Sequence, residues 1–422
     1  MKKFAFFWLF LGAALSASAQ VYMEKQSRHR FAQLTLGLDV QTSMGGHTVY
    51  PDPSGRLVGV DLPPRPSPRL LIGGTHFWGH ADFYIAIPLI SRPVETEGVE
   101  LDFLRGVETA FKYYPFKIQH GKVRPFLGVS LAPIVYRQNT DARRYGEGPR
   151  EVFVGVPLHG GVTFNSKSHL FELGFAWNYL NRVDYHVSPQ RRESISTPPF
   201  YAVISYRYML ETTLSAERDW ESGRTAKVTE VLASRGDLDG WFVGVGFSSA
   251  FWLEQSEYNR RRHPYISDYG ISLMPDVGLG YYFHVLDLNL NLAYRGYGEK
   301  VNVYGTTQEV SRKSLGVEAT KIFADYHGFA PFVGPVVSFE WLAFEESVEG
   351  GSSEKHEDTK FAAGLTFGWD IRPNRVQTWV LRTNLRWFPK LSLDGLEGGS
   401  IDFGNVEFNF IQVIVYPGRF SL

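Results

Sequence analysis

FAAGLTFGWD, the segment from Phe361 to Asp370, decides the fold because its side chains alternate strictly in character. Every second position is apolar: Phe361, Ala363, Leu365, Phe367 and Trp369. An α-helix would scatter these residues around its circumference, whereas a β-strand places them all on one face. The segment therefore predicts a strand with one apolar face and one face of small or polar residues.

The same alternation recurs along the whole chain, at 33–41, 171–179, 286–293 and 379–387. Soluble β-sandwiches alternate too, so this pattern alone does not place the strands in a membrane. The positions of the aromatic residues add that information. Trp241 and Phe251 bracket one segment, and Trp379 and Trp387 bracket another. These separations suit a tilted strand of about 9–11 residues that crosses a bilayer with an aromatic residue at each interface.

Counting such segments predicts an all-β chain, a transmembrane antiparallel up-and-down barrel of about 16 strands. The predicted strands are 31–42, 69–77, 81–89, 104–116, 124–137, 152–164, 169–179, 200–211, 241–252, 269–282, 286–296, 313–323, 329–344, 358–370, 377–387 and 405–416. Connectors at 78–80, 165–168, 283–285 and 372–376 are short. Those at 43–68, 180–199, 297–312 and 388–404 are long and rich in Gly, Pro or charge. Short turns on one side and long loops on the other are typical of outer-membrane barrels.

The strands form two sets of eight that echo each other. Gly106-Val-Glu-Thr-Ala110 is matched by Gly316-Val-Glu-Ala-Thr320, and Pro125-Phe-Leu-Gly128 by Pro331-Phe-Val-Gly334. We interpret this as a duplicated eight-strand unit. The predicted organisation is a signal peptide at 1–19, a first half at 20–210, a periplasmic connector at 211–239 and a second half at 240–422.

The connector at 211–239 is polar and charged, with a brief helix predicted near 226–232. It suits either an elaborate turn within one barrel or a linker between two. A single sheet of sixteen strands leaves no edge to protect, which slightly favours one 16-stranded barrel. Small residues at inward positions, such as Gly128, Ser130 and Gly246, suit the alternative of two tandem 8-stranded barrels filled by side chains.

The amino terminus has the layout of a secretory signal peptide. Lys2 and Lys3 precede an apolar run at 4–15, and Ala17-Ser18-Ala19 predicts cleavage between Ala19 and Gln20. The apolar run is shorter than the roughly 20 residues of a spanning helix. The chain contains no cysteine, which excludes disulfides and thiol chemistry, and its net charge of −1 argues against a nucleic-acid partner.

With the signal peptide, the Gly- and aromatic-rich strands, the segment PFLGVSLA at 125–132 and the loop pattern, the chain resembles the porin-like and small-barrel outer-membrane proteins. The resemblance is architectural and covers essentially the whole mature chain. It implies an outer-membrane location with both termini periplasmic, and contact with membrane lipid and lipopolysaccharide. It also implies folding by the barrel-assembly machinery, which would recognise Tyr416 or Phe420 near the last strand.

Ionisable residues at inward positions are the candidate lumen lining. They are Asp39, Asp82, Glu108, Lys112, Glu172, Arg207, Asp287, Arg295, Glu318, Asp370, Arg382 and Arg386. Both signs occur, so the residues form either a paired structural network or a pore lining of little net ion selectivity.

Three functions follow from this lining. A passive pore or small-solute transporter is the leading hypothesis. The alternative is a structural or adhesive barrel with a filled lumen that acts through its outer loops. A lipid-modifying enzyme at the rim, using His186 and Ser188, is remote, because the chain carries no G-x-S-x-G, H-E-x-x-H or Walker motif. We therefore predict no enzyme activity, cofactor or metal, while the sequence identifies no protein partner.

Three outer segments carry further expectations. The basic run Arg260-Arg261-Arg262-His263 is either a solvated surface or a binder of lipopolysaccharide phosphates. The acidic segment 345–360 is expected to be mobile and solvated, and the Pro-rich segment 51–68 to be stiff polyproline-like backbone.

Overall fold

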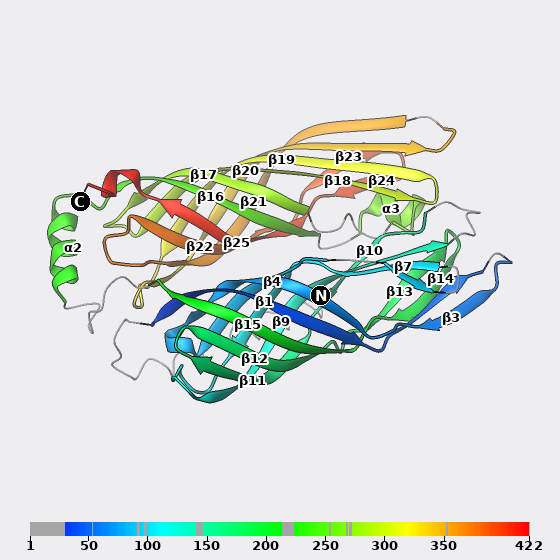
Figure 1. The fold of residues 1–422 in the computed structure, drawn as a ribbon. Coiled ribbons are helices and arrows are strands. Elements are labelled where there is room, and N and C mark those ends of the chain that lie inside the picture. The colour runs from blue at the N-terminus through cyan, green and yellow to red at the C-terminus, as the bar shows by residue number, and fades with distance from the viewer. Residues whose placement is uncertain are drawn as a thin grey trace.

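The computed structural model describes residues 30–421, apart from gaps at 53, 91–92, 97–98, 141–146, 213–222, 253–254, 267–268, 270–271 and 352. Its strands form two rings that lie side by side (Figure 1). The predicted signal peptide and its cleavage point between Ala19 and Gln20 lie outside the described residues.

The first barrel is a ring of eight antiparallel strands. In ring order they are β1 (Ala32–Met44), β4 (Arg65–His76), β5 (Ala81–Pro88), β8 (Glu108–Tyr113), β9 (Val123–Thr140), β11 (Leu158–Ser166), β12 (His169–Trp177) and β15 (Phe200–Glu211). The ring closes where β15 pairs with β1, with Leu38 opposite Tyr206.

The second barrel repeats this plan with eight later strands. They are β16 (Gly240–Trp252), β17 (Ser272–Phe283), β18 (Leu288–Val303), β19 (Thr306–Ile322), β20 (Phe329–Val348), β21 (Ser353–Ile371), β22 (Trp379–Phe388) and β25 (Asn405–Val415). This ring closes where β25 pairs with β16, with Val245 opposite Val413.

The all-β antiparallel fold in two eight-strand repeats is confirmed, and the slight preference for one 16-stranded barrel is wrong. β15, the last strand of the first half, forms its backbone hydrogen bonds with β1 of the same half. No unpaired strand edge therefore remains to join the second half. The echoed motifs fall on equivalent strands. Residues 108–110 and 316–320 belong to the fourth strand of each ring, and 125–128 and 331–334 to the fifth.

Above the first barrel, the long connectors fold into a β-rich layer that we call the first crown. Its strands are β2 (His47–Pro51), β3 (Leu57–Asp61), β6 (Val94–Thr96), β7 (Val99–Arg105), β10 (Glu151–Gly155), β13 (Arg182–Ser188) and β14 (Arg191–Ser196). They enclose an apolar core that includes Leu101, Tyr136 and Tyr185. The expected polyproline-like backbone at 51–68 is therefore wrong, because β3 and the start of β4 occupy half of it as paired strands.

The second crown consists of the extended ends of β18 to β21 with α3 (Glu257–Arg262), β23 (Ser392–Leu396) and β24 (Gly399–Asp402). The acidic segment 345–360, expected to be mobile, is a hairpin in which β20 and β21 continue pairing as far as Ser347 and Ser353. Likewise 297–312 is no loop. β18 and β19 pair up to a tight turn at Tyr304-Gly305, where both residues have positive φ.

At the opposite end, which we call the turn end, the connectors between strands of the same ring are short, as the loop pattern predicted, while the connector between the two rings is long. This end also carries η1 (Phe77–Gly79), α2 (Arg224–Ser234) and η2 (Pro417–Arg419) (Figure 1). The helix predicted near 226–232 lies within α2. No helix among the described residues is long and apolar enough to cross a membrane.

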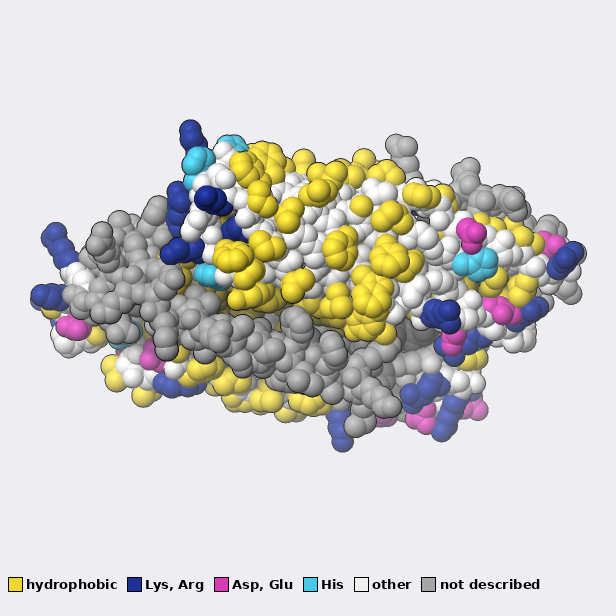
Figure 2. All heavy atoms as spheres, turned by 90° about the horizontal axis from the view of Figure 1, so that it is seen from below, with side chains coloured by type: hydrophobic (Ala, Val, Ile, Leu, Met, Phe, Trp, Pro, Cys, Tyr) yellow, Lys and Arg dark blue, Asp and Glu magenta, His cyan; other side chains and the backbone are white. Residues whose placement is uncertain are grey.

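The polarity of both barrels is inverted relative to a soluble protein. Large apolar side chains face outward and stay exposed, such as Leu38 at 53% and Ile204 at 65%, and Figure 2 shows them as a broad band on the first barrel. Charged side chains such as Arg69 and Arg386 are buried inside. A surface of this kind is stable in lipid, where closed rings also satisfy every strand's backbone.

Aromatic contacts join the two barrels at the turn end. Phe77 and Trp78 adopt positive φ, which costs a non-glycine residue roughly 1–2 kcal/mol. Their rings pack around Phe31, and Phe31 and Trp78 in turn contact Tyr326 of the second barrel with ring centroids 5.9 and 6.4 Å apart. Phe83 and Trp369 meet at 5.5 Å nearer the middle of the barrels. The strained turn at Phe77 and Trp78 therefore forms part of the interface between the two barrels.

Closure of the first ring can be tested with a disulfide. We expect Leu38→Cys with Tyr206→Cys to cross-link on oxidation, because the two residues are direct antiparallel partners, which places their Cβ atoms within disulfide reach. Faster migration of the unfolded, oxidised protein in a denaturing gel reports the bond. Tyr206→Cys with Val243→Cys is the matched control, and cross-linking of that pair instead would contradict two separate rings.

Candidate functional site

The barrel interiors are the candidate site, because alternation turns one face of every strand inward. The first interior holds six of the residues singled out as lumen lining, namely Asp39, Asp82, Glu108, Lys112, Glu172 and Arg207. The second holds five more, namely Arg295, Glu318, Asp370, Arg382 and Arg386. All eleven are almost completely buried, so they are packed against one another.

In the crown-side layer of the first barrel, one arginine connects two carboxylates. Arg69 on β4 donates to both carboxylate oxygens of Asp39 on β1, at 2.8 and 2.5 Å, and also donates to Glu108 on β8. The hydroxyl of Ser130 donates to Glu108 at 2.5 Å, and His159 Nε2 lies 2.8 Å from that hydroxyl. Five strands therefore meet in one network.

The second layer of the first barrel lies closer to the turn end. Arg207 on β15 donates to both oxygens of Asp82 on β5, at 2.9 and 2.5 Å. Lys112 on β8 donates to Glu172 on β12 at 2.5 Å. The ring of Tyr84 lies between the two cations, 4.7 Å from Lys112 Nζ and 4.8 Å from the Arg207 guanidinium. Below this layer, Arg124 donates to the carbonyls of Gly79 and Phe116.

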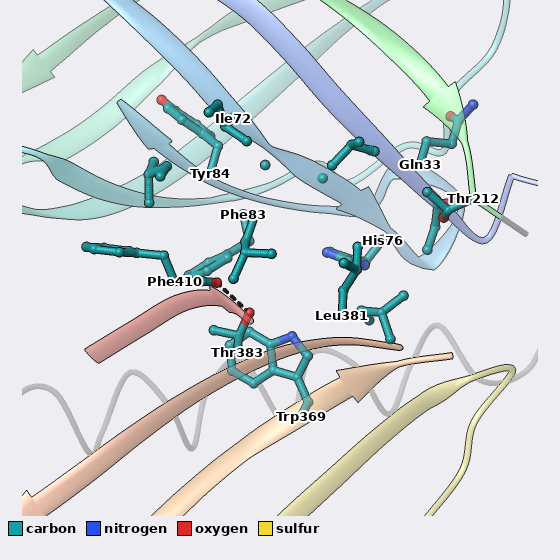
Figure 3. Close-up of a pocket in the computed structure, with 17 residues that line it drawn as sticks. Gln33, Ile72, His76, Phe83, Tyr84, Thr212, Trp369, Leu381, Thr383 and Phe410 are labelled. Carbon is teal, nitrogen blue, oxygen red and sulfur yellow. Dashed lines mark hydrogen bonds between the residues drawn. The ribbon is translucent and has the colours of Figure 1, made fainter. Parts of the chain in front are cut away.

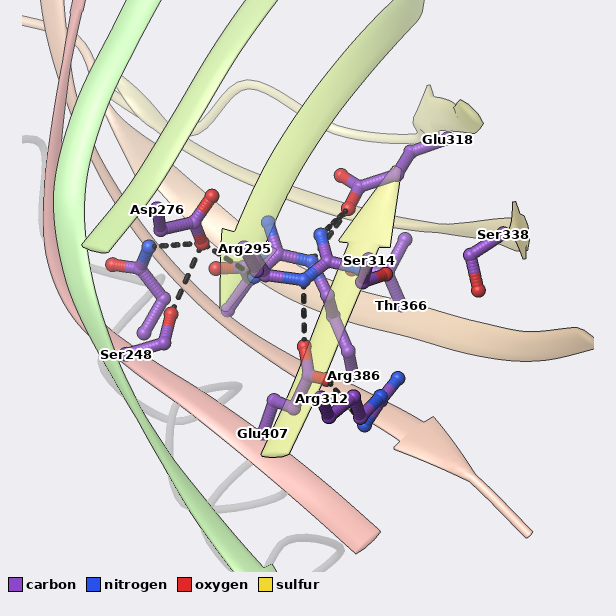
Figure 4. Close-up of polar contacts among 12 residues, drawn as sticks. Ser248, Asp276, Arg295, Arg312, Ser314, Glu318, Ser338, Thr366, Arg386 and Glu407 are labelled. Atoms are coloured by element: carbon purple, nitrogen blue, oxygen red, sulfur yellow. Dashed lines mark hydrogen bonds and ion pairs between the residues drawn. The ribbon is translucent and has the colours of Figure 1, made fainter. Parts of the chain in front are cut away.

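The second barrel contains a network built around Arg386 on β22 (Figure 4). Its Nη1 donates to Asp276 on β17 at 2.6 Å, and its Nε donates to Glu318 on β19 at 2.5 Å. Arg295 on β18 also donates to Glu318, at 3.0 Å, and its Nε lies 2.9 Å from Glu407 on β25. Each carboxylate is therefore shared between strands.

Toward the second crown, the same network continues through Arg312 on β19. Arg312 donates to both oxygens of Glu340 on β20, at 2.7 and 2.9 Å, and its Nη1 lies 3.0 Å from Glu407. Toward the turn end, Arg382 forms a separate bidentate pair with Asp370, at 2.7 and 2.9 Å. Paired, hydrogen-bonded charges of this kind are expensive to separate in a closed interior.

One predicted lumen residue, Asp287, lies elsewhere. It belongs to the turn between β17 and β18, has a positive φ of 46°, and accepts a hydrogen bond from the Tyr282 hydroxyl at 2.8 Å. The prediction is wrong because β18 begins at Leu288, so Asp287 precedes the alternating part of the strand.

Sequence reasoning missed six charged residues of the interiors. The missed residues are Arg69, Arg124, Asp276, Arg312, Glu340 and Glu407. Asp276 and Glu407 sit within predicted strands, where a strict count of alternate positions would have found them. Arg312 fell in a segment assigned to a loop, and Arg69 stood at the first residue of its predicted strand.

Ser130, His159 and Glu108 have the residue types of a catalytic triad but not its geometry. The serine hydroxyl and Glu108 both approach the same imidazole nitrogen, Nε2, at 2.8 and 3.3 Å. A triad needs them on opposite nitrogens. Among the described residues, no cluster of His, Asp or Glu is placed to hold a metal ion. These three side chains therefore belong to the packed network.

The proposed rim pair, His186 and Ser188, lies on β13 in the first crown. The His186 carbonyl accepts a hydrogen bond from Tyr304 of the second barrel at 2.8 Å. Burial lowers the pKa of the His186 imidazole, with a contribution from nearby Arg192. The segment around this pair thus contributes to contact between the crowns.

A buried polar cluster holds α3 onto the second crown. Glu346 accepts hydrogen bonds from Tyr258 at 2.9 Å and from Gln308 at 2.7 Å, and lies 3.1 Å from His263. Burial raises the pKa of Glu346, but the hydrogen bonds from His263 and Gln308 outweigh it, so the net pKa is lowered. The basic run is accordingly helical, with Arg261 paired to Glu257 at 2.6 Å and Arg262 to Glu397 at 3.1 Å.

Closed rings with apolar exteriors and charged interiors define the chain as a transmembrane β-barrel protein with the architecture of outer-membrane barrels. The sequence matches no family model and no curated protein.

Among solved structures, the chain is similar to Neisserial surface protein A, at 18% identity with a TM-score of 0.31, covering 42% of this chain and 97% of that one. It is also similar to Ail, the attachment invasion locus protein of Yersinia pestis, at 11% identity with a TM-score of 0.28 and the same coverages. An outer membrane channel from Pseudomonas putida F1 matches at 8% identity with a TM-score of 0.22, covering 91% and 95%. These similarities carry no information about function.

The importance of the second network can be tested by removing its central cation. We expect Arg386→Ala to destabilise the protein by about 3–5 kcal/mol, because Asp276 and Glu318 would lose a buried partner. Urea unfolding in lipid vesicles measures the loss. Arg261→Ala, on the exposed face of α3, is the control and should change stability little. Equal effects of both variants would contradict a structural role for the network.

Proposed function

We propose that the chain is a surface protein of the outer membrane, in which two filled barrels anchor two folded crowns that bind partners outside the cell. In this proposal the crowns face the exterior, and the turn end and both termini face the periplasm. This is the adhesive or structural alternative considered from the sequence, rather than the pore.

Packing of the interiors is the observation that supports this choice. In the first barrel, Arg69 and Arg207 contact carboxylates on strands that are not their ring neighbours, Glu108 and Asp82, and both arginines are no more than 1% exposed. In the second, Arg295, Arg312 and Arg386 fill the corresponding space. A solute would have to separate these pairs, and each ion left unpaired in a buried site costs several kcal/mol. A passive pore fits this interior less well than an anchor does.

The crowns have the properties of binding platforms. Each has an apolar core of its own, and the two are joined where Tyr304 donates through its backbone N–H to the Glu147 carbonyl, at 2.8 Å, and through its hydroxyl to His186. The sheet β13-β14-β2-β3 ends in β3, whose outer backbone groups have no strand partner among the described residues of that sheet. Exposed edges of this kind can pair with an extended segment of another protein.

The remaining expectations follow from this placement. Membrane lipid and lipopolysaccharide would surround the barrels, and the barrel-assembly machinery would insert them. Since Arg261 and Arg262 are paired within the crown, a phosphate site on α3 is not part of the proposal. Neither enzyme activity nor a cofactor or nucleic acid has a role in it, and the protein partner remains to be identified.

A conductance measurement distinguishes anchor from pore. We expect the purified, folded protein to produce no channel steps in a planar bilayer, because both lumens are closed by ion pairs. Alanine at Arg69, Glu108, Arg207 and Asp82 together removes pairs from both layers of the first lumen and provides a matched variant in which conductance should rise. Steady channel openings in the wild-type protein would overturn the proposal.

Orientation can be tested with single cysteines, since the chain contains none. Glu357→Cys in the second crown should react with a membrane-impermeant maleimide on intact cells, whereas Gln119→Cys at the turn end should react only after the outer membrane is opened. Both positions are exposed, so a difference reports sidedness rather than burial. The reverse pattern would place the crowns in the periplasm.

A further inference from the structure

A crevice that is partly open to the surroundings lies between the two barrels (Figure 3). One wall comes from β1, β4 and β5, including Leu34, Ile72 and Phe83, and the other from β21, β22 and β25, including Trp369 and Leu381. The lining is largely apolar and comes from the outward faces of both rings.

The position of the crevice determines what surrounds it. Leu34 continues the outward row of β1 that includes Leu36 and Leu38, which are 48% and 53% exposed and belong to the lipid-facing band. Ala32 and His76, at the turn end of their strands, also line the crevice. The crevice therefore opens at hydrocarbon depth in the turn-side half of the membrane, where acyl chains rather than water are the neighbouring molecules.

A glycine keeps this space open. Gly74 faces outward on β4, between Ile72 and His76, and a Cβ atom there would lie 3.0 Å from the Gln33 carbonyl oxygen and 3.4 Å from His76 Nε2. Phe83, whose ring contacts Trp369 and Phe408 at 5.5 and 6.2 Å, holds the barrels together beside the gap. The gap is thus framed by packed aromatic side chains rather than left by loose contact.

The crevice also has a polar end. Figure 3 shows His76 near Leu381 on the side of β4 that faces the second barrel. Its Nδ1 is buried and has no hydrogen-bond partner among the described residues. A buried imidazole nitrogen without a partner is costly, so a ligand with a polar group at this level would stabilise the site.

We propose that the crevice binds an acyl chain of a phospholipid from the turn-side leaflet, with the ester or head-group region beside His76. The lipid would fill the gap between the barrels and act as part of their interface. This inference rests on the membrane placement of the barrels and not on whether their lumens conduct.

Retained lipid provides the test. The wild-type protein, extracted in a mild detergent and washed extensively, should keep phospholipid that mass spectrometry of a solvent extract detects in stoichiometric amount. Ile72→Trp fills the crevice and should reduce retained phospholipid to the background level. Leu38→Trp makes a similar change on the exposed part of β1 and should leave retention unchanged. Wild-type protein without retained phospholipid, or equal retention by Ile72→Trp, would overturn the proposal.

A second measurement needs no variant and so does not depend on folding of Ile72→Trp. The wild-type protein is reconstituted with a phospholipid that carries a photoreactive group in its acyl chain, washed in detergent, and then irradiated. Cross-links should concentrate on crevice residues such as Leu34, Trp369 and Leu381. Labelling confined to the exposed rows, such as Leu173 and Ile204, would contradict a lipid held between the barrels.

Discussion

The structure depends on one constraint, which is that no strand edge can be left unpaired in lipid. Each ring satisfies this constraint with its own strands, because β15 pairs with β1 in the first ring and β25 pairs with β16 in the second. A ring of eight strands is narrow, so its inward side chains meet across the lumen and have to fill it. The number of strands in the ring therefore determines that the lumen is filled, whichever charged residues fill it.

Within these narrow lumens, charge pairing takes the place of an apolar core. Some arginines reach across the ring. The contacts of Arg207 on β15 with Asp82 on β5, and of Arg386 on β22 with Asp276 on β17, tie strands that are not neighbours. Such pairs contribute less to net stability than to a unique arrangement, because their desolvation offsets most of the attraction. The rigid interiors in turn hold two crowns whose contacts meet at Tyr304.

Much of this fold could be predicted from alternation, since period-2 patterns such as Phe361 to Trp369 report directly which face meets lipid. Alternation does not indicate which strand closes a ring, so it cannot distinguish one barrel from two. The pairing of Leu38 with Tyr206 does distinguish them, because it closes the first ring within its own half. Alternation also failed to predict the strand segments that extend beyond the membrane. Arg312 and the acidic segment 345–360 look like loop by composition, yet their backbones continue as paired strands above the barrel. The crevice at Gly74 arises from contact between distant strands, which no local pattern contains.

Closure of each ring within its own half has a consequence for biogenesis. All eight strands of the first ring have been synthesised by Glu211, before the first strand of the second begins at Gly240. Membrane insertion can therefore proceed in two stages, with a finished ring and no exposed edge as the intermediate. A sixteen-stranded ring would instead have to keep β1 unpaired until the carboxy-terminal strand arrived.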